Sequence, residues 1–200
     1  MNWWLKSRAW SGLAPVILAT TLLGLLAGEA ALPVPVLAGA SGTFLVAHLI
    51  PVLPAAFLLH GYGRTDTRME HVASRPMRLW NVALALAASA GAAVASVLAY
   101  LAWHNDITLV TGRNIVAYIA LAVIGAFLLG PRNSAVVTTV IPLAMAATGW
   151  TPAGDPEPWA WVLHPARSTT AATVTLVLLL AAAATAVSSQ STGPLSRSRS

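Results

Sequence analysis

His48 is the side chain best suited to carry out chemistry inside an apolar stretch of this sequence. In a helix that rises 1.5 Å per residue, it would lie about 10 Å below the outer end of its segment. Pro51 and Pro54 follow it, and each proline removes a backbone hydrogen bond to the residue four positions earlier. The freed carbonyls would belong to Ala47 and Ile50. His48 is therefore either a structural histidine in a kinked helix or a residue that lines a substrate or proton path.

The other reactive side chains do not converge on a catalytic set. The string Gly39-Ala40-Ser41-Gly42 has the GxSG pattern of an intramembrane serine protease, but no companion AHxxG string is present. His48 lies two turns along the same helix and is poorly placed to serve as the base, so Ser41 is better interpreted as a helix N-cap. No two histidines have HxxxH spacing, and the chain has no cysteine. We therefore expect no enzyme activity, no metal and no cofactor.

The composition places the chain in a membrane. Hydrophobic residues make up 57% of the sequence and charged residues only 8%, whereas a soluble domain carries about 25% charged residues. So few charges cannot cover a surface that faces water, which excludes a cytosolic enzyme and a nucleic-acid-binding module. We interpret the net charge of +5 as a topology signal and expect no nucleic-acid partner.

Six apolar stretches are long enough, or nearly long enough, to cross a bilayer, which takes about 20 residues. They lack the period-2 alternation of barrel strands, so they are predicted to be helices. The predicted fold class is an all-α membrane protein, a six-transmembrane helix bundle spanning 11–187. An amphipathic segment (1–10) precedes it and a disordered tail (188–200) follows it. The predicted spans are 11–28, 41–59, 79–103, 109–129, 134–150 and 168–187.

The placement of Lys and Arg predicts how these helices are oriented. With the N-terminus inside, nine of the eleven basic residues are cytoplasmic, and only Arg113 and Arg167 lie outside. Both termini are then cytoplasmic in a multi-pass protein of the plasma membrane. The competing interpretation is that residues 1–30 are a cleaved signal peptide, because Lys6 and Arg8 precede an apolar run. The tryptophans before the first span favour an interfacial segment instead.

The connections between spans carry further signals. In the loop 60–78, Thr67 and Glu70 have the spacing of a capping box and predict a short helix; the alternative is a solvated basic loop that only sets topology. Gly130 and Pro131 predict a tight antiparallel hairpin in which Pro131 ends one helix. The loop 151–167 is rich in Pro and Trp, and its tryptophans either anchor it at the lipid headgroups or belong to a re-entrant outer gate.

Small residues at four-residue spacing indicate close helix packing. Gly24 and Gly28 form a GxxxG pattern on the first span, and a second pattern lies on the third span, at Ala87, Gly91, Ala95 and Ala99. Such faces would seal either a single bundle or a dimer.

In their order along the chain, these features resemble the membrane subunit of an ABC-2-type transporter. The Trp-rich start is similar to the amphipathic elbow helix of that family, and the region between spans five and six is similar to its re-entrant region. The loop that runs from Glu70 to Arg75-Pro76-Met77-Arg78 is similar to the coupling loop of that family, which touches the ATPase. Small permeases of this type are similar in Arg132-Asn133-Ser134 and in Trp159-Ala160-Trp161 with Pro165. The chain is shorter than usual and its outer elements are cut down, which leaves open whether a full translocation path forms.

The resemblance implies a permease subunit of an ATP-driven exporter, paired as a homodimer or heterodimer, with a peptide, drug or lipid-like cargo. A separate ATP-binding subunit would dock on the loop 60–78, through Arg68, Glu70, His71, Arg75 and Arg78. The distribution of charge along the sequence agrees with an external energy source, because no charged side chain is expected at mid-membrane depth to bind a coupling ion. The alternative is a non-transporting scaffold or accessory subunit, with an intramembrane enzyme as a distant third.

Overall fold

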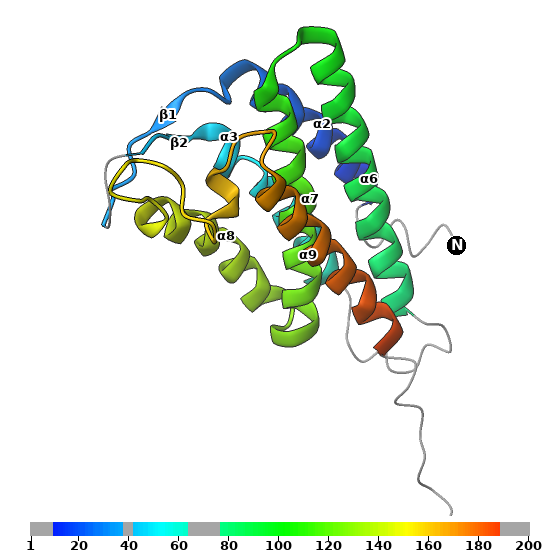
Figure 1. Ribbon diagram of the computed structural model, residues 1–200. Coiled ribbons are helices and arrows are strands. Elements are labelled where there is room, and N and C mark those ends of the chain that lie inside the picture. The colour runs from blue at the N-terminus through cyan, green and yellow to red at the C-terminus, as the bar shows by residue number, and fades with distance from the viewer. Residues whose placement is uncertain (1–9, 38–41, 64–76, 189–200) are drawn as a thin grey trace, which may run out of the picture.

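The structure is a computed structural model and describes residues 10–37, 42–63 and 77–188. Within these ranges, each of the six apolar stretches contains a helix (Figure 1). A two-stranded antiparallel element joins the first two stretches, with β1 (Ala31–Leu32) paired to β2 (Phe44–Leu45). The helices are α2 (Trp10–Ala27), α3 (Val46–Leu49), α4 (Val52–Gly63), α6 (Met77–Trp103), α7 (Asp106–Leu129), α8 (Pro131–Thr148) and α9 (Thr169–Ser188), with the 3-10 helix η1 (Trp161–Leu163) before α9.

Three of these helical stretches are long and apolar enough to cross a membrane, judged by length and composition. They are Val46–Gly63, Leu79–Trp103 and Asp106–Leu129. Shorter apolar helices lie at Gly12–Ala27 and Thr169–Thr185. The described chain is therefore mostly helical and has three helices that could cross a membrane, and the six predicted spans stay a prediction.

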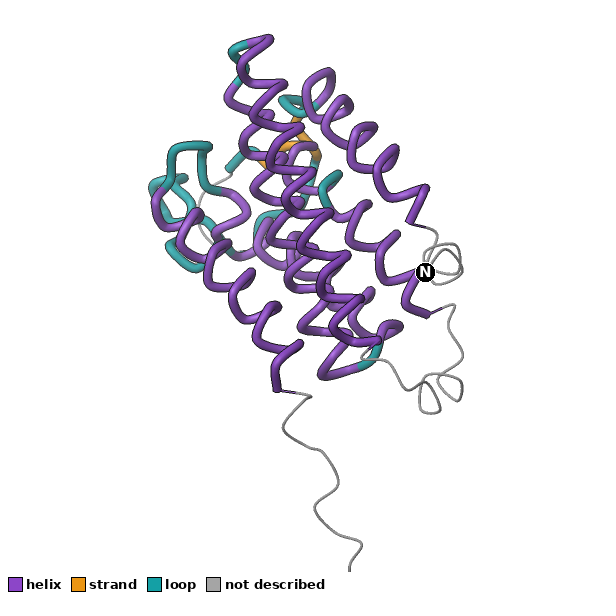
Figure 2. The backbone as a smooth tube through the Cα atoms, turned by 90° about the vertical axis from the view of Figure 1, so that its right-hand side faces the viewer, coloured by secondary structure: helices purple, strands orange, loops and turns teal. Residues whose placement is uncertain are grey.

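Helix α7 lies at the centre of the bundle, and α2, α4, α6, α8 and α9 all pack against it (Figure 1). Figure 2 shows the long helices lying side by side. Ile115, Tyr118 and Ile119 on α7 are buried. From Ile115 onward α7 is apolar apart from Tyr118, and this suits a central position because that part of the helix has no charged face to present to solvent. The centre of the bundle is thus filled by side chains of α7.

Hydrogen bonds between helix ends show that the main helices alternate in direction. The Asn105 amide, just before α7, donates to the Glu29 carboxylate just after α2 (3.2 Å). The Tyr62 hydroxyl, near the end of α4, donates to the Asn81 carbonyl near the start of α6 (2.7 Å). We call the end of the bundle with the Asn105–Glu29 contact the acidic end. It holds the acidic residues of the described chain, Glu29, Asp106, Asp155 and Glu157.

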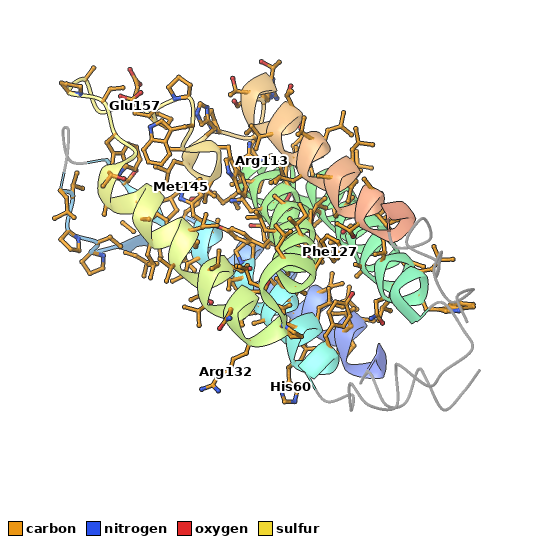
Figure 3. The ribbon with its side chains drawn as sticks, turned by 90° about the horizontal axis from the view of Figure 1, so that it is seen from below. His60, Arg113, Phe127, Arg132, Met145 and Glu157 are labelled. Carbon is orange, nitrogen blue, oxygen red and sulfur yellow. The ribbon has the colours of Figure 1, made fainter. Side chains whose placement is uncertain are left out.

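The opposite end of the bundle, which we call the basic end, is marked by Arg132 and His60. Both side chains project away from the bundle on the same side, opposite Glu157 (Figure 3). The hairpin between α7 and α8 lies at this end, and its Gly130 has φ +82° and is the C-cap of α7. Pro131 is the first residue of α8 and does not end α7. Proline suits that first helical position, because its missing N–H would have no partner there.

The predicted second span, 41–59, is broken into two helices. Helix α3 ends at Leu49, residues 50 and 51 form a turn, and α4 continues to Gly63, past the predicted end of the span. The cause is Pro51, which cannot donate a hydrogen bond into the preceding turn. The loop predicted to begin at His60 therefore begins after Gly63. Ser41 lies outside the described residues.

The GxxxG pattern seals the bundle from within. A methyl group placed on Gly24 would lie 2.6 Å from the Thr111 hydroxyl of α7, so the two helices touch at this glycine. Gly91, in the second pattern, has no heavy atom within 4 Å of the same position. It faces an apolar groove of about 290 Å³ between α2 and α6.

Candidate functional site

The residues predicted to contact an ATP-binding subunit lie almost wholly outside the described chain. Arg68, Glu70, His71 and Arg75 fall in 64–76, as does the predicted short helix. Arg78 is the second residue of α6, and its side chain is not among those described. The amphipathic segment of residues 1–9 and the tail from 189 also lie outside these ranges. These expectations stay predictions.

His48 makes a local hydrogen bond. It is the third residue of α3, and its Nδ1 atom accepts a hydrogen bond from the backbone N–H of Leu45 (3.2 Å). This contact satisfies one of the N–H groups that a helix start leaves free. The His48 ring is buried, and Phe44 packs against it with ring centroids 5.5 Å apart. Of the two interpretations of His48, the geometry favours the structural histidine over a residue that lines a path.

The most elaborate polar arrangement in the described chain is at the acidic end, where residues 149–168 join α8 to α9. We call these residues the cap segment. The backbone N–H of Glu157 donates to the Gly149 carbonyl, and that of Thr151 donates to the Asp155 carbonyl, both at 2.9 Å. These bonds close the segment into a compact turn, and a methyl group on Gly149 would collide with Ala160. The segment therefore folds back toward the bundle.

The tryptophans of this region do not all behave as membrane anchors. Trp161 is buried together with Val162 and Leu163 of η1, and Trp150 is buried next to α8, whereas Trp159 is 51% exposed. The interpretation of these tryptophans as headgroup anchors is thus wrong for Trp150 and Trp161. For Trp159 it stays a prediction, and so does the alternative of a re-entrant outer gate.

Arg113 fastens the cap segment to α7. Its guanidinium donates to the backbone carbonyls of His164 (2.7 Å) and Pro165 (2.8 Å). The next residue, Asn114, is buried, and its amide donates to the Val162 carbonyl at 3.4 Å. Arg113 lies where α7 faces the segment that leads into α9 (Figure 3). Adjacent side chains of one helix thus hold three carbonyls of the cap segment.

His164 fastens the same segment to α9. Its Nε2 atom lies 3.1 Å from the Glu157 carbonyl, and its Nδ1 atom lies 3.1 Å from the Ser168 hydroxyl. Because a carbonyl can only accept, Nε2 carries the proton and Nδ1 accepts from Ser168. The Ser168 oxygen also accepts from the backbone N–H of Ala171 (3.3 Å) and so caps α9. The start of α9 and the shape of the cap segment are therefore coupled.

The charge of Arg113 has no acidic partner among the described residues. The ion pair found in that part of the chain joins Arg167 to Asp106 at 3.9 Å, and both of its side chains are largely exposed. From the sequence, Arg113 was predicted only to be one of the two basic residues on the outside. The signal that would have found it is the pair Arg113-Asn114 inside an apolar helix, because intramembrane polar residues are commonly functional. No group of three metal-ligating side chains occurs among the described residues.

Comparisons with known proteins assign no family. No protein-family model matches the chain, and neither a curated protein nor a solved structure matches it. We therefore infer the function from the fold and from the acidic-end site, by which we mean Arg113, Asn114 and the carbonyls of the cap segment that they bind.

Proposed function

We propose that this chain is the membrane-spanning permease subunit of an ATP-driven, ABC-2-like exporter in the plasma membrane. The observation that carries the proposal is the course of the cap segment, which turns back into the bundle between the fifth and sixth apolar stretches and buries Trp161, Val162 and Leu163. The ABC-2 resemblance expects a Trp- and Pro-rich re-entrant region at this place in the chain.

The alternating helix directions support six passes. If the three long helices cross the bilayer, then α2, α8 and α9, which pack beside α7, run through the same layer. The whole sequence also has the charge bias that the positive-inside rule describes, because nine of its eleven Lys and Arg fall in segments expected at the basic end and two, Arg113 and Arg167, fall at the acidic end. This arrangement would place both termini and the loop between α4 and α6 in the cytoplasm.

The distribution of charge supports an external energy source. Within the described helices the carboxylate is Asp106, the first residue of α7, and none lies in the middle of a helix. Carriers driven by protons or sodium commonly keep an acidic residue at that depth to bind the coupling ion. A separate ATP-binding subunit that docks on the loop between α4 and α6, through Glu70 and its neighbours, would supply the energy.

A specific observation also favours the second candidate, a non-transporting accessory subunit. The centre of a single copy is filled, because Ile115, Tyr118 and Ile119 of α7 are buried there. Transport would therefore require a path between two copies, or between this chain and another permease. An accessory subunit would require no path.

The two candidates differ in whether an ATP-binding protein travels with the chain. We would isolate the affinity-tagged full chain from its native membrane and photolabel the preparation with 8-azido-ATP. A labelled partner is expected with the wild type and should be lost with Glu70→Arg, which adds positive charge to the loop and so preserves the topology signal. Arg132→Gln, at the same end of the bundle, is the matched control and should retain the partner.

The outcomes separate the claims. Loss in Glu70→Arg alone supports docking on the loop. Equal labelling in both variants removes the docking residues from the proposal. The absence of any labelled protein with the wild type would contradict the permease function and favour the accessory subunit.

A further inference from the structure

The guanidinium of Arg113 is a partly buried cation with neutral partners. Its partners are the carbonyls of His164 and Pro165 and, at 3.4 Å, the Oδ1 atom of Asn114. Removing a cation from water is costly unless an opposite charge or several good acceptors compensate it. Neutral carbonyls compensate it in part, and no carboxylate among the described residues lies within 4 Å to complete the compensation.

The acceptors of Arg113 imitate the shape of an anion. Its two terminal nitrogens each meet one carbonyl oxygen, at 2.7 and 2.8 Å, and the two carbonyls belong to consecutive residues. A guanidinium binds a carboxylate or a phosphate through the same pair of parallel donors. The cap segment thus presents two oxygens where an anion would present two, but without the negative charge.

Two features make these donors available to an incoming ligand. The bond from Arg113 to the Pro165 carbonyl is on the exposed side of the site, so an anion can reach the guanidinium without the whole cap segment opening. The Asn114 amide makes a long bond of 3.4 Å to the Val162 carbonyl. That distance exceeds the usual range for an N–H···O bond, so the cap segment holds the buried Asn114 amide only weakly.

We propose that Arg113 and Asn114 form a binding site for an anionic headgroup, a phosphate or a carboxylate, and that the carbonyls of His164 and Pro165 occupy this site when it is empty. The ligand exchanges with these carbonyls and releases the segment between η1 and α9. The inference goes beyond the proposed function, because binding at this site requires no ATPase and no transport. The shared chemistry comes from two sources, a lipid headgroup at the membrane surface or free phosphate.

The test uses the full chain in lipid nanodiscs without any ATP-binding protein. The chain has no cysteine, so Ala166→Cys provides a single position for a spin label, next to Pro165. In phosphatidylcholine the label should be restrained. Phosphatidylglycerol should mobilise it if the site takes a lipid headgroup, and millimolar inorganic phosphate in phosphatidylcholine should mobilise it if the site takes the free anion.

Charge variants show whether Arg113 is responsible. Arg113→Gln should leave the label mobile in every lipid and without a response to either anion. Arg113→Lys keeps the charge but loses the paired donors, so it should weaken the anion response by about tenfold or more in half-saturating concentration. Arg167→Gln and Arg167→Lys are the matched controls at the same end, and both should respond like the wild type.

A label that neither anion mobilises in the wild-type background would overturn the proposal. An equal loss of response in the Arg113 and Arg167 variants would also overturn it, because the effect would then belong to the general charge of the surface. If Arg113→Gln does not fold, the comparison between Arg113→Lys and Arg167→Lys still decides the question. None of these results depends on the permease function, whose own test is the labelled ATP-binding partner.

Discussion

The hydroxyl of Tyr118, at the centre of α7, donates a hydrogen bond of 2.8 Å to the backbone carbonyl of His48, seventy positions earlier in the chain. That carbonyl lies beside the break between α3 and α4, where the regular helical hydrogen bonds are interrupted. A carbonyl buried in such a place needs a hydrogen-bond donor from another part of the chain. Through this hydrogen bond, Tyr118 of the central helix α7 stabilises the break between α3 and α4.

The variant Tyr118→Phe should therefore destabilise the fold while leaving its packing volume nearly unchanged. The buried carbonyl of His48 would lose its partner, which typically costs about 1–3 kcal/mol. The measurement is the free energy of unfolding of the full chain in detergent, followed by circular dichroism. Tyr100→Phe, on the less buried end of α6, is the control and should have a small effect. Equal stability of Tyr118→Phe and the wild type would contradict this role for the hydroxyl.

Two glycines that look alike in the sequence should respond oppositely to alanine. A methyl group at Gly24 would lie 2.6 Å from Oγ1 and 2.8 Å from Cγ2 of Thr111. The Thr111 side chain is buried and donates to the Ile107 carbonyl, so it cannot move aside freely. Overpacking of this kind typically costs about 1–3 kcal/mol.

At Gly91, by contrast, the added methyl group meets no atom within 4 Å. Alanine there should be neutral or stabilising by up to about 1 kcal/mol, because glycine is a poor helix former. In the same detergent, the thermal midpoint of Gly24→Ala should lie below that of the wild type, and the thermal midpoint of Gly91→Ala should lie at or above it. A loss at Gly91 comparable to the loss at Gly24 would show that the α2–α6 groove is covered in solution.

Ser168 has two partners, and its removal should affect both α9 and the cap segment. Ser168→Ala takes away the acceptor for the Ala171 N–H and the donor to the His164 ring. The loss of the N-cap alone should cost about 0.5–2 kcal/mol. We expect lower stability together with faster hydrogen exchange in residues 157–165. Thr169→Ala, one position along and exposed, is the control because it keeps the Ser168 hydroxyl. Equally fast exchange in that variant would contradict the specific role of Ser168.

The sequence predicted the helices well, because apolar runs of this length have few other ways to satisfy their backbone in lipid. The helices α6, α7 and α9 lie within a few residues of the predicted spans. The break after Leu49 was foreseen only as a kink at Pro51 and Pro54. The two-residue strands were not predicted, because so short a pairing leaves no periodic pattern to recognise.

The acidic-end site was much less accessible to prediction. Arg113 and the carbonyls of His164 and Pro165 are about fifty residues apart, and a carbonyl acceptor has no sequence signature at all. The tryptophans were visible in the sequence, but whether Trp161 faces lipid or the bundle depends on the turn that Gly149 and its neighbours make. Contacts of backbone groups across long separations are decided by tertiary packing, and they carry no local pattern.

The alternating helices lead to a topology prediction that the cysteine-free sequence makes simple to test. Asp155→Cys lies in the cap segment at the acidic end, and Thr67→Cys lies in the chain between α4 and α6. With the basic end in the cytoplasm, a membrane-impermeant maleimide should label Asp155→Cys in intact cells and should label Thr67→Cys only after the cells are permeabilised. The unmodified chain is the control for background labelling. In the six-pass arrangement an even number of crossings lies between the loop after α4 and each terminus, so the loop and both termini are on the same side of the membrane. If both positions react in intact cells, or if Thr67→Cys reacts and Asp155→Cys does not, then the six-pass arrangement with cytoplasmic termini is wrong.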